Sequence, residues 1–310
     1  MSNQRYDVIT ALDTCADLIV RGGDVVPRFG QAEQLVDGYF LEMGGSACIF
    51  ACQCAKLGLR TTGVGKVGGD AFGELVLRRL VEAGVDTSNV PVDGGVQTGL
   101  GIALCREEGE RAILTVTGSI GAAEPEALLK ALPLARHLHV ASYYLLCGLR
   151  AHWPAILREA KRLGLTTSLD TNWDPAEKWD GLDELAPYLD ILLPNENELA
   201  AFTGIGDAEN AAKALAKRVP LVVAKQGPAG AMAVRRGEEP VWCPAPATEA
   251  VDTVGAGDTF DGGFLYGHLN GWSLADSLRM GVFCGSKSVT QPGGYQGQPR
   301  LGDLNDLYAG

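Results

Sequence analysis

The stretch EAVDTVGAGDTFDGGFLYG, residues 249–267, places small residues and carboxylates at the expected start of a helix. Gly255, Ala256 and Gly257 allow a tight turn in which a ligand can reach the backbone N–H groups. Apolar residues follow at helical spacing, so these N–H groups lie in a first helical turn, where they have no internal partner and favour an anion such as phosphate. Asp258 would repel that anion unless it accepts a proton. The stretch therefore predicts an anion-binding turn with a general base.

The polar residues that could work with this turn stand at the ends of expected strands. Between residues 135 and 226, short apolar or β-branched runs alternate with helical segments, which predicts a parallel sheet with right-handed crossovers. In such sheets ligands bind at the carboxyl ends of the strands. The residues found there are Asp170, Asn172, Asn195, Glu198 and Lys225. We expect them to line one site.

Some of these positions indicate metal or nucleotide contacts, each with a structural alternative. Asn195 and Glu198 lie three residues apart at the start of a helix, where two oxygen donors can hold the water shell of Mg²⁺. The alternative is an acidic helix N-terminus that the helix dipole stabilises. Lys225 precedes the glycine turn at Gly227, and its alternative is a solvated surface lysine. The residues alone leave both choices open.

A second glycine-containing helix start lies near the N-terminus. Gly44 and Gly45 precede Ser46, which we expect to cap the helix, and Gly58 ends it. The arrangement is either a tight turn into a buried helix or a place where the backbone approaches a small polar ligand.

Two segments break the alternation of strands and helices. Residues 18–42 and 96–117 have the pattern of short alternating strands with turn signals. We expect them to pair as a small sheet outside the main one. No internal repeat, low-complexity segment or flexible linker separates them from the rest, so residues 1–310 are expected to form a single domain.

Composition narrows the class of protein. The net charge is −12 with no basic run, so nucleic acid is not an expected partner. No apolar run is long enough to span a bilayer, and the first residues lack the pattern of a secretion signal, which favours a cytoplasmic protein without membrane contact. The eight cysteines show neither a disulfide framework nor paired zinc spacing, and we interpret them as reduced thiols that pack as small hydrophobic residues.

The segment GVGKVGG raises a different function. Gly63, Gly65 and Gly68 form a GxGxxG pattern, which in nicotinamide-dependent dehydrogenases follows a strand and opens a helix. Here a helix precedes the pattern, and further glycines follow it together with Asp70. This context argues against a dehydrogenase.

The motifs, taken in their order along the chain, resemble the ribokinase-like, or PfkB, carbohydrate kinases. They are GGSACIFACQCAKLG with GKVGGDAFG, then DTN, NENE, KQGPAG and DTVGAGDTF. The resemblance spans about residues 10–295. It implies an ATP-dependent kinase for a small hydroxylated substrate, with an α/β fold: a ribokinase-like three-layer domain that has a mostly parallel central sheet plus a small β-sheet lid. In many members the lid also forms the dimer contact, so the resemblance implies a homodimer.

The resemblance also implies roles for the residues that transfer the phosphoryl group. The amides of Gly255, Ala256 and Gly257 stabilise the charge on the transferred phosphoryl oxygens, and Asp258 takes the proton of the attacking hydroxyl. Asn195 and Glu198 match the motif that is associated with Mg²⁺ through water.

Further matches imply nucleotide, cation and sugar contacts. Lys225 and Gly227 match the nucleotide-contacting turn. Asp252 matches a position that in many members helps to bind a monovalent cation such as K⁺, and the loop near Gly293 and Gly294 closes that site. The matches to sugar-contacting positions are Asp17, Gly44, Gly45 and Asn172.

Two departures from the family pattern bear on the substrate. Ile49 stands where the family commonly has an asparagine that contacts a substrate hydroxyl, and Asp174 stands where many members for acidic sugars or fructose have an arginine. Because an anionic group without a cationic partner is costly to desolvate, and Asp174 would repel it, we expect a neutral pentose or hexose. Were the substrate anionic, the missing cation would be Arg21, Arg28 or Arg111.

We therefore predict ATP-dependent phosphorylation of a small neutral sugar. A nucleoside kinase of the same fold is the first alternative, and a dehydrogenase or a non-catalytic sugar-binding regulator are the others. The base Asp258, the glycine turn and the Asn195–Glu198 pair together argue against a regulator, since a protein that only binds has no use for a base.

Overall fold

The computed structural model describes residues 5–106 and 111–308, and a nine-stranded, mostly parallel sheet forms their centre. The strand order is β15-β14-β13-β12-β11-β10-β1-β4-β6, and only β14 and β15 run antiparallel to their neighbours. A short pair, β5 and β7, lies beside it. The bounds are β1 (Val8–Ala11), β4 (Thr61–Val64), β5 (Val67–Gly68), β6 (Asp86–Asn89), β7 (Val92–Asp93), β10 (His137–Val140), β11 (Thr166–Leu169), β12 (Ile191–Leu192), β13 (Leu221–Lys225), β14 (Ala231–Arg235) and β15 (Val241–Cys243).

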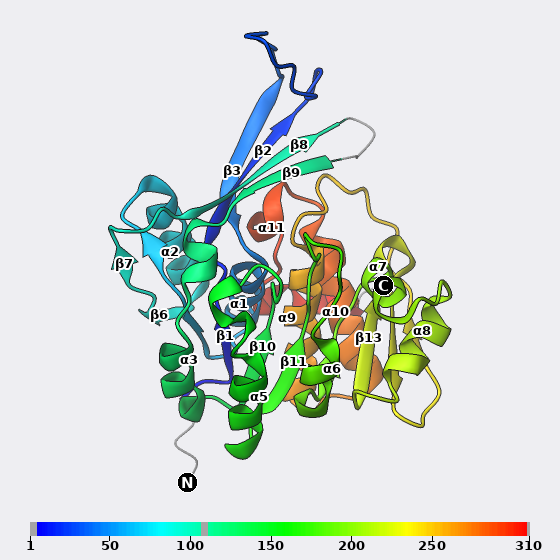
Figure 1. The fold of residues 1–310 in the computed structure, drawn as a ribbon. Coiled ribbons are helices and arrows are strands. Elements are labelled where there is room, and N and C mark those ends of the chain that lie inside the picture. The colour runs from blue at the N-terminus through cyan, green and yellow to red at the C-terminus, as the bar shows by residue number, and fades with distance from the viewer. Residues whose placement is uncertain (1–4, 107–110, 309–310) are drawn as a thin grey trace.

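Helices cover both faces of this sheet (Figure 1). One layer holds α3 (Pro125–Ala131), α5 (Trp153–Arg162), α6 (Leu182–Leu185), α7 (Glu196–Thr203) and α8 (Ala208–Leu215). The other holds α1 (Ser46–Lys56), α2 (Ala71–Ala83), α9 (Ala256–Leu269) and α10 (Leu274–Ser288). The remaining helical segments are α4 (Cys147–Arg150), α11 (Gly293–Gln296), η1 (Gly118–Ala122), η2 (Leu132–Leu134), η3 (Ala186–Tyr188), η4 (Gly227–Ala229) and η5 (Leu301–Tyr308).

Side-chain periodicity explains why these elements form three layers. In β13, Leu221 and Val223 pack toward α9 and α10, whereas Val222 and Ala224 pack toward α8, as the alternation of a strand requires. In α5 the buried residues are Trp153, Ile156, Leu157 and Ala160, which follow helical spacing and form one apolar face. The structure confirms the predicted mostly parallel sheet between two helical layers.

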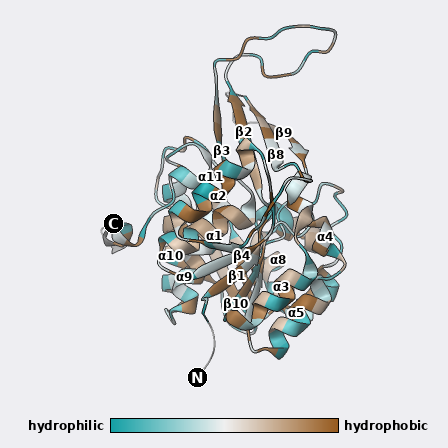
Figure 2. Ribbon diagram, turned by 90° about the vertical axis from the view of Figure 1, so that its left-hand side faces the viewer, coloured by the Kyte–Doolittle hydropathy of each residue, from teal (hydrophilic) through white to brown (hydrophobic). Residues whose placement is uncertain are grey.

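The second sheet, called the small sheet below, contains β3 (Gly38–Gly44), β2 (Cys15–Arg21), β8 (Gly99–Cys105) and β9 (Arg111–Val116), in that order. The pair β2 and β8 is parallel, and the outer pairs are antiparallel. The small sheet stands above the main one in Figures 1 and 2. Relative to the predicted segments, β2 starts earlier, at Cys15, and β3 ends later, at Gly44.

The two faces of the small sheet differ in exposure. Ile19 and Ala103 are buried on the face toward the main domain. On the opposite face, large apolar side chains are exposed on β3 and β9, among them Tyr39, Leu41 and Leu114. Monomeric proteins rarely leave such a contiguous apolar surface uncovered, so this face has the composition of an interaction surface.

The GxGxxG pattern does not form the turn of a dinucleotide-binding unit. Gly63 lies within β4, Gly68 lies within β5, and Asp70 caps the helix α2 through the amide of Gly73. A side chain at Gly68 would meet the backbone of Thr98 at 2.7 Å, so this glycine is required for close packing.

All eight cysteines are free thiols, and five of them are buried. Cys48, Cys52 and Cys54 lie in the buried helix α1, where burial raises the pKa of each thiol. In the described part of the chain, no helix combines the length and hydrophobicity needed to cross a bilayer.

Candidate active site

A cavity of about 1060 Å³ opens where the small sheet faces the carboxyl ends of the main strands and the first turns of α1 and α9. Most of the predicted site residues line it: Asp17, Gly45, Asn172, Asn195, Glu198, Lys225, Gly227, Gly255, Ala256, Gly257 and Asp258. Gly44, Asp252 and Gly293 were predicted with them but lie behind its wall. Segments far apart in the sequence therefore meet at one site, as the parallel sheet led us to expect.

The anion-binding turn has the predicted backbone geometry. Gly255 precedes α9 with φ 70°, a left-handed conformation that favours glycine. A Cβ at Gly255 would also lie 2.7 Å from the Cα of Gly294. Within the described residues, the amides of Gly257 and Asp258 have no hydrogen-bond acceptor. These two N–H groups are available to an anion in the cavity.

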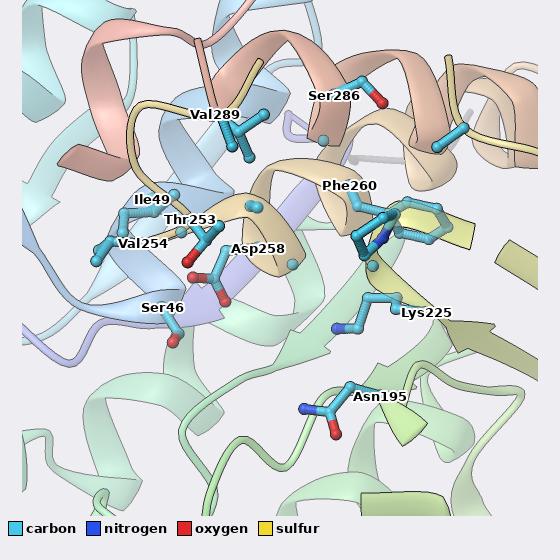
Figure 3. Close-up of a pocket in the computed structure, with 18 of the residues that line it drawn as sticks. Ser46, Ile49, Asn195, Lys225, Thr253, Val254, Asp258, Phe260, Ser286 and Val289 are labelled. Carbon is cyan, nitrogen blue, oxygen red and sulfur yellow. The ribbon is translucent and has the colours of Figure 1, made fainter. Parts of the chain in front are cut away.

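Asp258 follows Gly257 directly in the sequence, and its carboxylate is buried. Its side chain lies in the same space as Ser46, Lys225 and Asn195 (Figure 3). Burial, together with the negative charge of Asp170, raises the pKa of Asp258 to about 7. The Nδ2 of Asn172 lies 3.5 Å from Oδ1 of Asp258. A carboxylate with a pKa near neutrality is well matched to accept a proton from a hydroxyl.

Lys225 is buried and paired, so the alternative of a solvated surface lysine is wrong. Its Nζ donates to Oδ2 of Asp170 at 2.6 Å and lies 3.2 Å from Oδ2 of Asp261. Burial alone would lower the pKa of Lys225, but the charges of Asp170 and Asp261 raise it above its usual value. A Cβ at Gly257 would lie 3.4 Å from this Nζ, which places the lysine charge beside the anion-binding turn.

Asn195 and Glu198 form a reciprocal capping box at the start of α7. The Glu198 amide donates to Asn195 Oδ1 at 3.0 Å, and the Asn195 amide donates to Glu198 Oε2 at 2.9 Å. This geometry agrees with the alternative interpretation of the pair, in which Asn195 and Glu198 stabilise the start of the helix. Burial and the charge of Asp170 raise the pKa of Glu198 to about 8, although the positive charge of Lys225 acts in the opposite direction.

The residues present fit a Mg²⁺ ion held through water. No group of three or more His, Cys, Asp or Glu side chains is arranged for direct ligation in the described chain. Glu198 nevertheless lines the cavity as a buried carboxyl group beside Asn195, and Mg²⁺ usually keeps several of its waters.

Asp17 and the glycines around it form the opposite wall. Asp17 projects from β2, and a side chain at either Gly44 or Gly101 would overlap its carboxylate. Gly44 thus leaves space for Asp17, although it does not reach the cavity itself. Burial and the charges of Asp13 and Asp252 raise the pKa of Asp17 to about 7.

Asp13 caps α1 in place of Ser46, which corrects the predicted cap. The two oxygens of Asp13 accept the amides of Ser46 at 2.8 Å and Ala47 at 2.9 Å, and the Ser142 hydroxyl also donates to it. The Ser46 side chain is therefore released toward the cavity. Burial raises the pKa of Asp13 to about 6.

Sequence reasoning missed Asp13 and Asp261. The available signal was a charged residue inside an otherwise buried apolar run, since Asp13 follows β1 and Asp261 lies one turn after Asp258 on α9.

Asn172 has an unusual backbone conformation that aims its side chain at the site. Its φ is 55°, and the φ of Ser142 is 51°. The Ser142 amide donates to Asn172 Oδ1 at 2.6 Å, which leaves Nδ2 directed toward Asp258. Left-handed conformations at residues other than glycine cluster at functional sites.

Asp252 and Gly293 lie next to each other behind the anion-binding turn. The Gly293 amide donates to Asp252 Oδ2 at 3.0 Å, and Arg21 Nη2 donates to the same oxygen at 2.6 Å. Asp252 and Gly293 are therefore close together, as predicted, but the guanidinium group of Arg21 is bound to the carboxylate of Asp252. The role of Asp252 in binding a monovalent cation stays a prediction.

Two departures from the family pattern have different outcomes. Ile49 lines the cavity and would be 2.9 Å from a Cβ at Gly255, so it packs beneath the turn. Asp174 does not line the cavity: its carboxylate accepts the amides of Ala176, Lys178 and Trp179. Burial would raise the pKa of Asp174, but these donors hold it below its usual value. The expected repulsion of an anionic substrate by Asp174 is therefore wrong.

A three-layer α/β domain with a free anion-binding turn and a buried carboxylate beside it defines a small-molecule kinase. The model of the pfkB family of carbohydrate kinases matches residues 13–301, so the chain belongs to that family. The chain is thus an ATP-dependent carbohydrate kinase and not a dehydrogenase.

Relatives and solved structures agree with this family. A fructokinase from Klebsiella pneumoniae is 31% identical over 278 residues, which cover 84% of this chain and 90% of that protein. The structure of Arabidopsis thaliana ribokinase complexed with ribose and ATP has a TM-score of 0.84 at 24% identity, covering 98% of this chain and 99% of that one. The structure of adenosine kinase from Sinorhizobium meliloti has a TM-score of 0.84 at 26% identity, covering 97% and 99%. The fold is that of ribokinase-like enzymes.

The raised carboxyl pKa values predict that stability falls as pH rises. Asp13, Asp17, Asp258 and Glu198 have folded pKa values of about 6, 7, 7 and 8, above those of unfolded carboxyl groups. Between about pH 4 and pH 8 these four groups bind more protons in the folded state than in the unfolded state, so their contribution to the free energy of unfolding decreases with pH. The lowered pKa values of His137, His139 and His268 act in the opposite direction, mainly below about pH 7. Urea unfolding at about pH 7 and pH 8, where the histidine side chains are largely neutral in both states, should give a lower midpoint at the higher pH. Asp258→Asn should reduce the difference, and an equal or higher midpoint at pH 8 would contradict the assignment.

Proposed function

We propose that this kinase transfers the γ-phosphoryl group of ATP to a hydroxyl of a neutral pentose or hexose, with Asp258 as the general base. The observation that carries the proposal is the pair of amides, Gly257 and Asp258, that have no acceptor among the described residues and lie beside a buried carboxylate in the cavity. Phosphoryl transfer requires mainly positioning and stabilisation of charge, and this arrangement supplies both.

Asp258 accepts the proton of the sugar hydroxyl as the oxygen attacks phosphorus. The Asn172 amide group, 3.5 Å from Oδ1, orients the carboxylate and leaves its second oxygen for the hydroxyl. The low exposure of Asp258 limits competition from water.

Positive charge for the transferred group comes from two sources in this chain. The amides of Gly257 and Asp258 point from the first turn of α9, where the helix dipole adds to their effect. Lys225 Nζ lies behind the same turn and is held there by Asp170 and Asp261. These groups are fixed before the reaction, so little reorganisation accompanies the transfer.

Asn195 and Glu198 would hold Mg²⁺ through water. The ion would neutralise phosphate charge when bound. Glu198 supports this role because it is buried, lines the cavity and lacks a cationic partner among the hydrogen bonds of its capping box.

The nucleotide would occupy the apolar half of the cavity. Gly227 and Pro228 in η4, Pro246, Val282 on α10 and Val289 directly after α10 line this half. Apolar walls with few polar groups are typical of small-molecule sites.

The sugar would lie at the opposite end, between Asp17 and Asn172, whose side chains can bind hydroxyl groups. Two of the three arginines that could serve an anionic substrate are engaged elsewhere, since Arg28 pairs with Asp24 and Arg21 with Asp252. Arg111 lines the cavity, where its positive charge attracts the carboxylate of Asp17 and lowers the pKa of that carboxyl group. The local charges thus favour a neutral acceptor.

The exposed face of the small sheet supports a homodimer. Tyr39, Leu41 and Leu114 expose large apolar side chains on this face. A second copy of the chain, related by a two-fold axis, would bury the same face of both sheets.

Asp258→Asn should lower kcat by roughly 10² or more, because the general base is lost, while ATP affinity stays nearly unchanged. In the wild type, kcat/KM should rise with pH up to about 7, the pKa to which burial and Asp170 raise the Asp258 carboxyl group, and the variant should lose this dependence. Steady-state kinetics and calorimetric ATP titration measure both. Near-normal turnover by Asp258→Asn would remove this residue from the mechanism.

Glu198→Gln should raise the Mg²⁺ concentration needed for half-maximal rate, because the charge that attracts the hydrated ion is removed. Glu196→Gln is the matched control, since Glu196 is exposed on the first turn of the same helix. Thermal unfolding of both variants separates a loss of the capping box from a loss of metal affinity. If the two variants have the same Mg²⁺ dependence, Glu198 acts only as a helix cap.

A panel of acceptors with coupled detection of ADP tests the substrate class. We expect the highest kcat/KM for a neutral pentose or hexose, and far lower values for 2-keto-3-deoxygluconate and fructose 6-phosphate. A nucleoside is the second candidate, because Ile49 makes the sugar end more apolar and the adenosine kinase structure shares this fold. Preference for an anionic acceptor, abolished by Arg111→Gln and retained in Arg28→Gln, would overturn the neutral assignment.

A further inference from the structure

An ion pair connects the small sheet to the loop that precedes the anion-binding turn. Arg21 is the last residue of β2, and Asp252 lies six residues before Asp258. Arg21 Nη2 and Asp252 Oδ2 are 2.6 Å apart, although the residues are separated by 231 positions in the sequence. The Asp252 side chain is 7% exposed. A nearly buried carboxylate needs such a partner to offset the cost of its desolvation.

The remaining hydrogen bonds of Asp252 come from donors on two other segments. The Val254 amide donates to Oδ1 at 3.0 Å, and the Gly293 amide donates to Oδ2 at 3.0 Å. The backbone is held as well, because the amides of Val251 and Asp252 both donate to the carbonyl of Val289. The loop is thus attached to the small sheet, to the end of α10 and to the start of α11.

Close backbone packing extends these attachments to the anion-binding turn. A Cβ at Gly255 would lie 2.7 Å from Gly294 Cα, and a Cβ at Gly293 would lie 2.8 Å from the ring of Phe40 on β3. Gly293 has φ 74°, which favours glycine at this contact. The small sheet therefore contacts the loop directly through Arg21 and contacts Gly293 through Phe40, while the turn packs on Gly294.

The surroundings of the Asp252 carboxylate do not fit a bound K⁺ ion. A monovalent cation requires oxygen ligands around it, whereas the groups on this carboxylate are two N–H donors and a guanidinium group. Arg21 already supplies one positive charge, and an arginine stays protonated at any working pH. The charge balance that a K⁺ ion would provide is present without it.

We propose that Arg21 is a positioning residue that replaces a monovalent cation: its guanidinium group fixes Asp252 and thereby the amides of Gly257 and Asp258. Arg21 does not line the cavity in which both substrates would bind. This proposal rests on the proposed function, because it assigns the anion-binding turn to phosphoryl transfer. It makes the kinase independent of K⁺.

The test compares Arg21→Ala and Arg21→Lys with Arg28→Ala, a matched control whose arginine forms an exposed pair with Asp24. Rates are measured with K⁺, Na⁺ or tetramethylammonium as the only monovalent cation, at constant ionic strength. We expect the wild type and Arg28→Ala to be indifferent to the cation. Arg21→Ala should lose roughly tenfold or more in kcat, because Asp252 is left without its partner, with a smaller effect on the KM of the sugar. Arg21→Lys should retain an intermediate rate.

Chemical rescue distinguishes positioning from a general loss of structure. Millimolar guanidinium, well below denaturing concentrations, should restore part of the rate of Arg21→Ala and leave Arg28→Ala unchanged. A variant that is merely destabilised would recover no activity, because millimolar guanidinium occupies no specific site in it and leaves the free energy of unfolding nearly unchanged. Activation of the wild type by K⁺, or an Arg21→Ala enzyme that behaves like Arg28→Ala, would overturn the proposal.

Hydrogen exchange gives a readout that needs no turnover. Peptides covering residues 249–260 should exchange faster in Arg21→Ala than in the wild type, and guanidinium should slow this exchange. If no sugar is phosphorylated but exchange responds as described, the proposed function fails and the positioning role stands. Unchanged exchange in this segment would overturn the positioning role even if the enzyme is an active sugar kinase.

Discussion

The buried ammonium group of Lys225 is the interaction on which the site depends. It joins Asp170 at the end of β11 to Asp261 on α9, so it ties the sheet edge to the helix that carries the anion-binding turn. Without it, two buried carboxylates would face Asp258 and Glu198 with no cation among them, and desolvation would keep protons on several of these groups. One lysine thus determines both the position of α9 and the electrostatic balance of the cavity.

The main sheet and the helices α1 and α9 contribute different groups to the site around Lys225. The main sheet brings carboxylates and amides to one edge, and the first turns of α1 and α9 direct N–H groups toward it. Asp13 uses the N–H groups of α1, whereas those of Gly257 and Asp258 on α9 are left without an acceptor in the described chain. The first turn of α1 is therefore structural, because Asp13 accepts its N–H groups, whereas the first turn of α9 can bind a ligand.

The parts of the site that sequence reasoning could predict are the local ones. The glycine turn at Gly255 depends on a conformation that few residues adopt, and a polar residue after a buried strand is visible in a single segment. The errors concern partners that are distant in the chain. Ser46 looked like a cap because nothing nearby in the sequence competes with it, but Asp13 reaches it from another strand. In the same way, the pairing of Lys225 with Asp261 depends on packing that no motif specifies. Asp174 is an exception, because the amide of Trp179 that donates to it is only five residues away and the turn was overlooked.

The four connectors of the small sheet give the enzyme a mechanical constraint. They are residues 12–14 before β2, Gly45 between β3 and α1, residues 94–98 before β8, and Thr117 after β9. Because four connectors hold the small sheet, it can tilt as a rigid body, but it cannot fold away from the cavity as a single loop can. Gly45 and Asp17 both line the cavity. A tilt of the small sheet would therefore move both of these parts of the cavity wall at the same time.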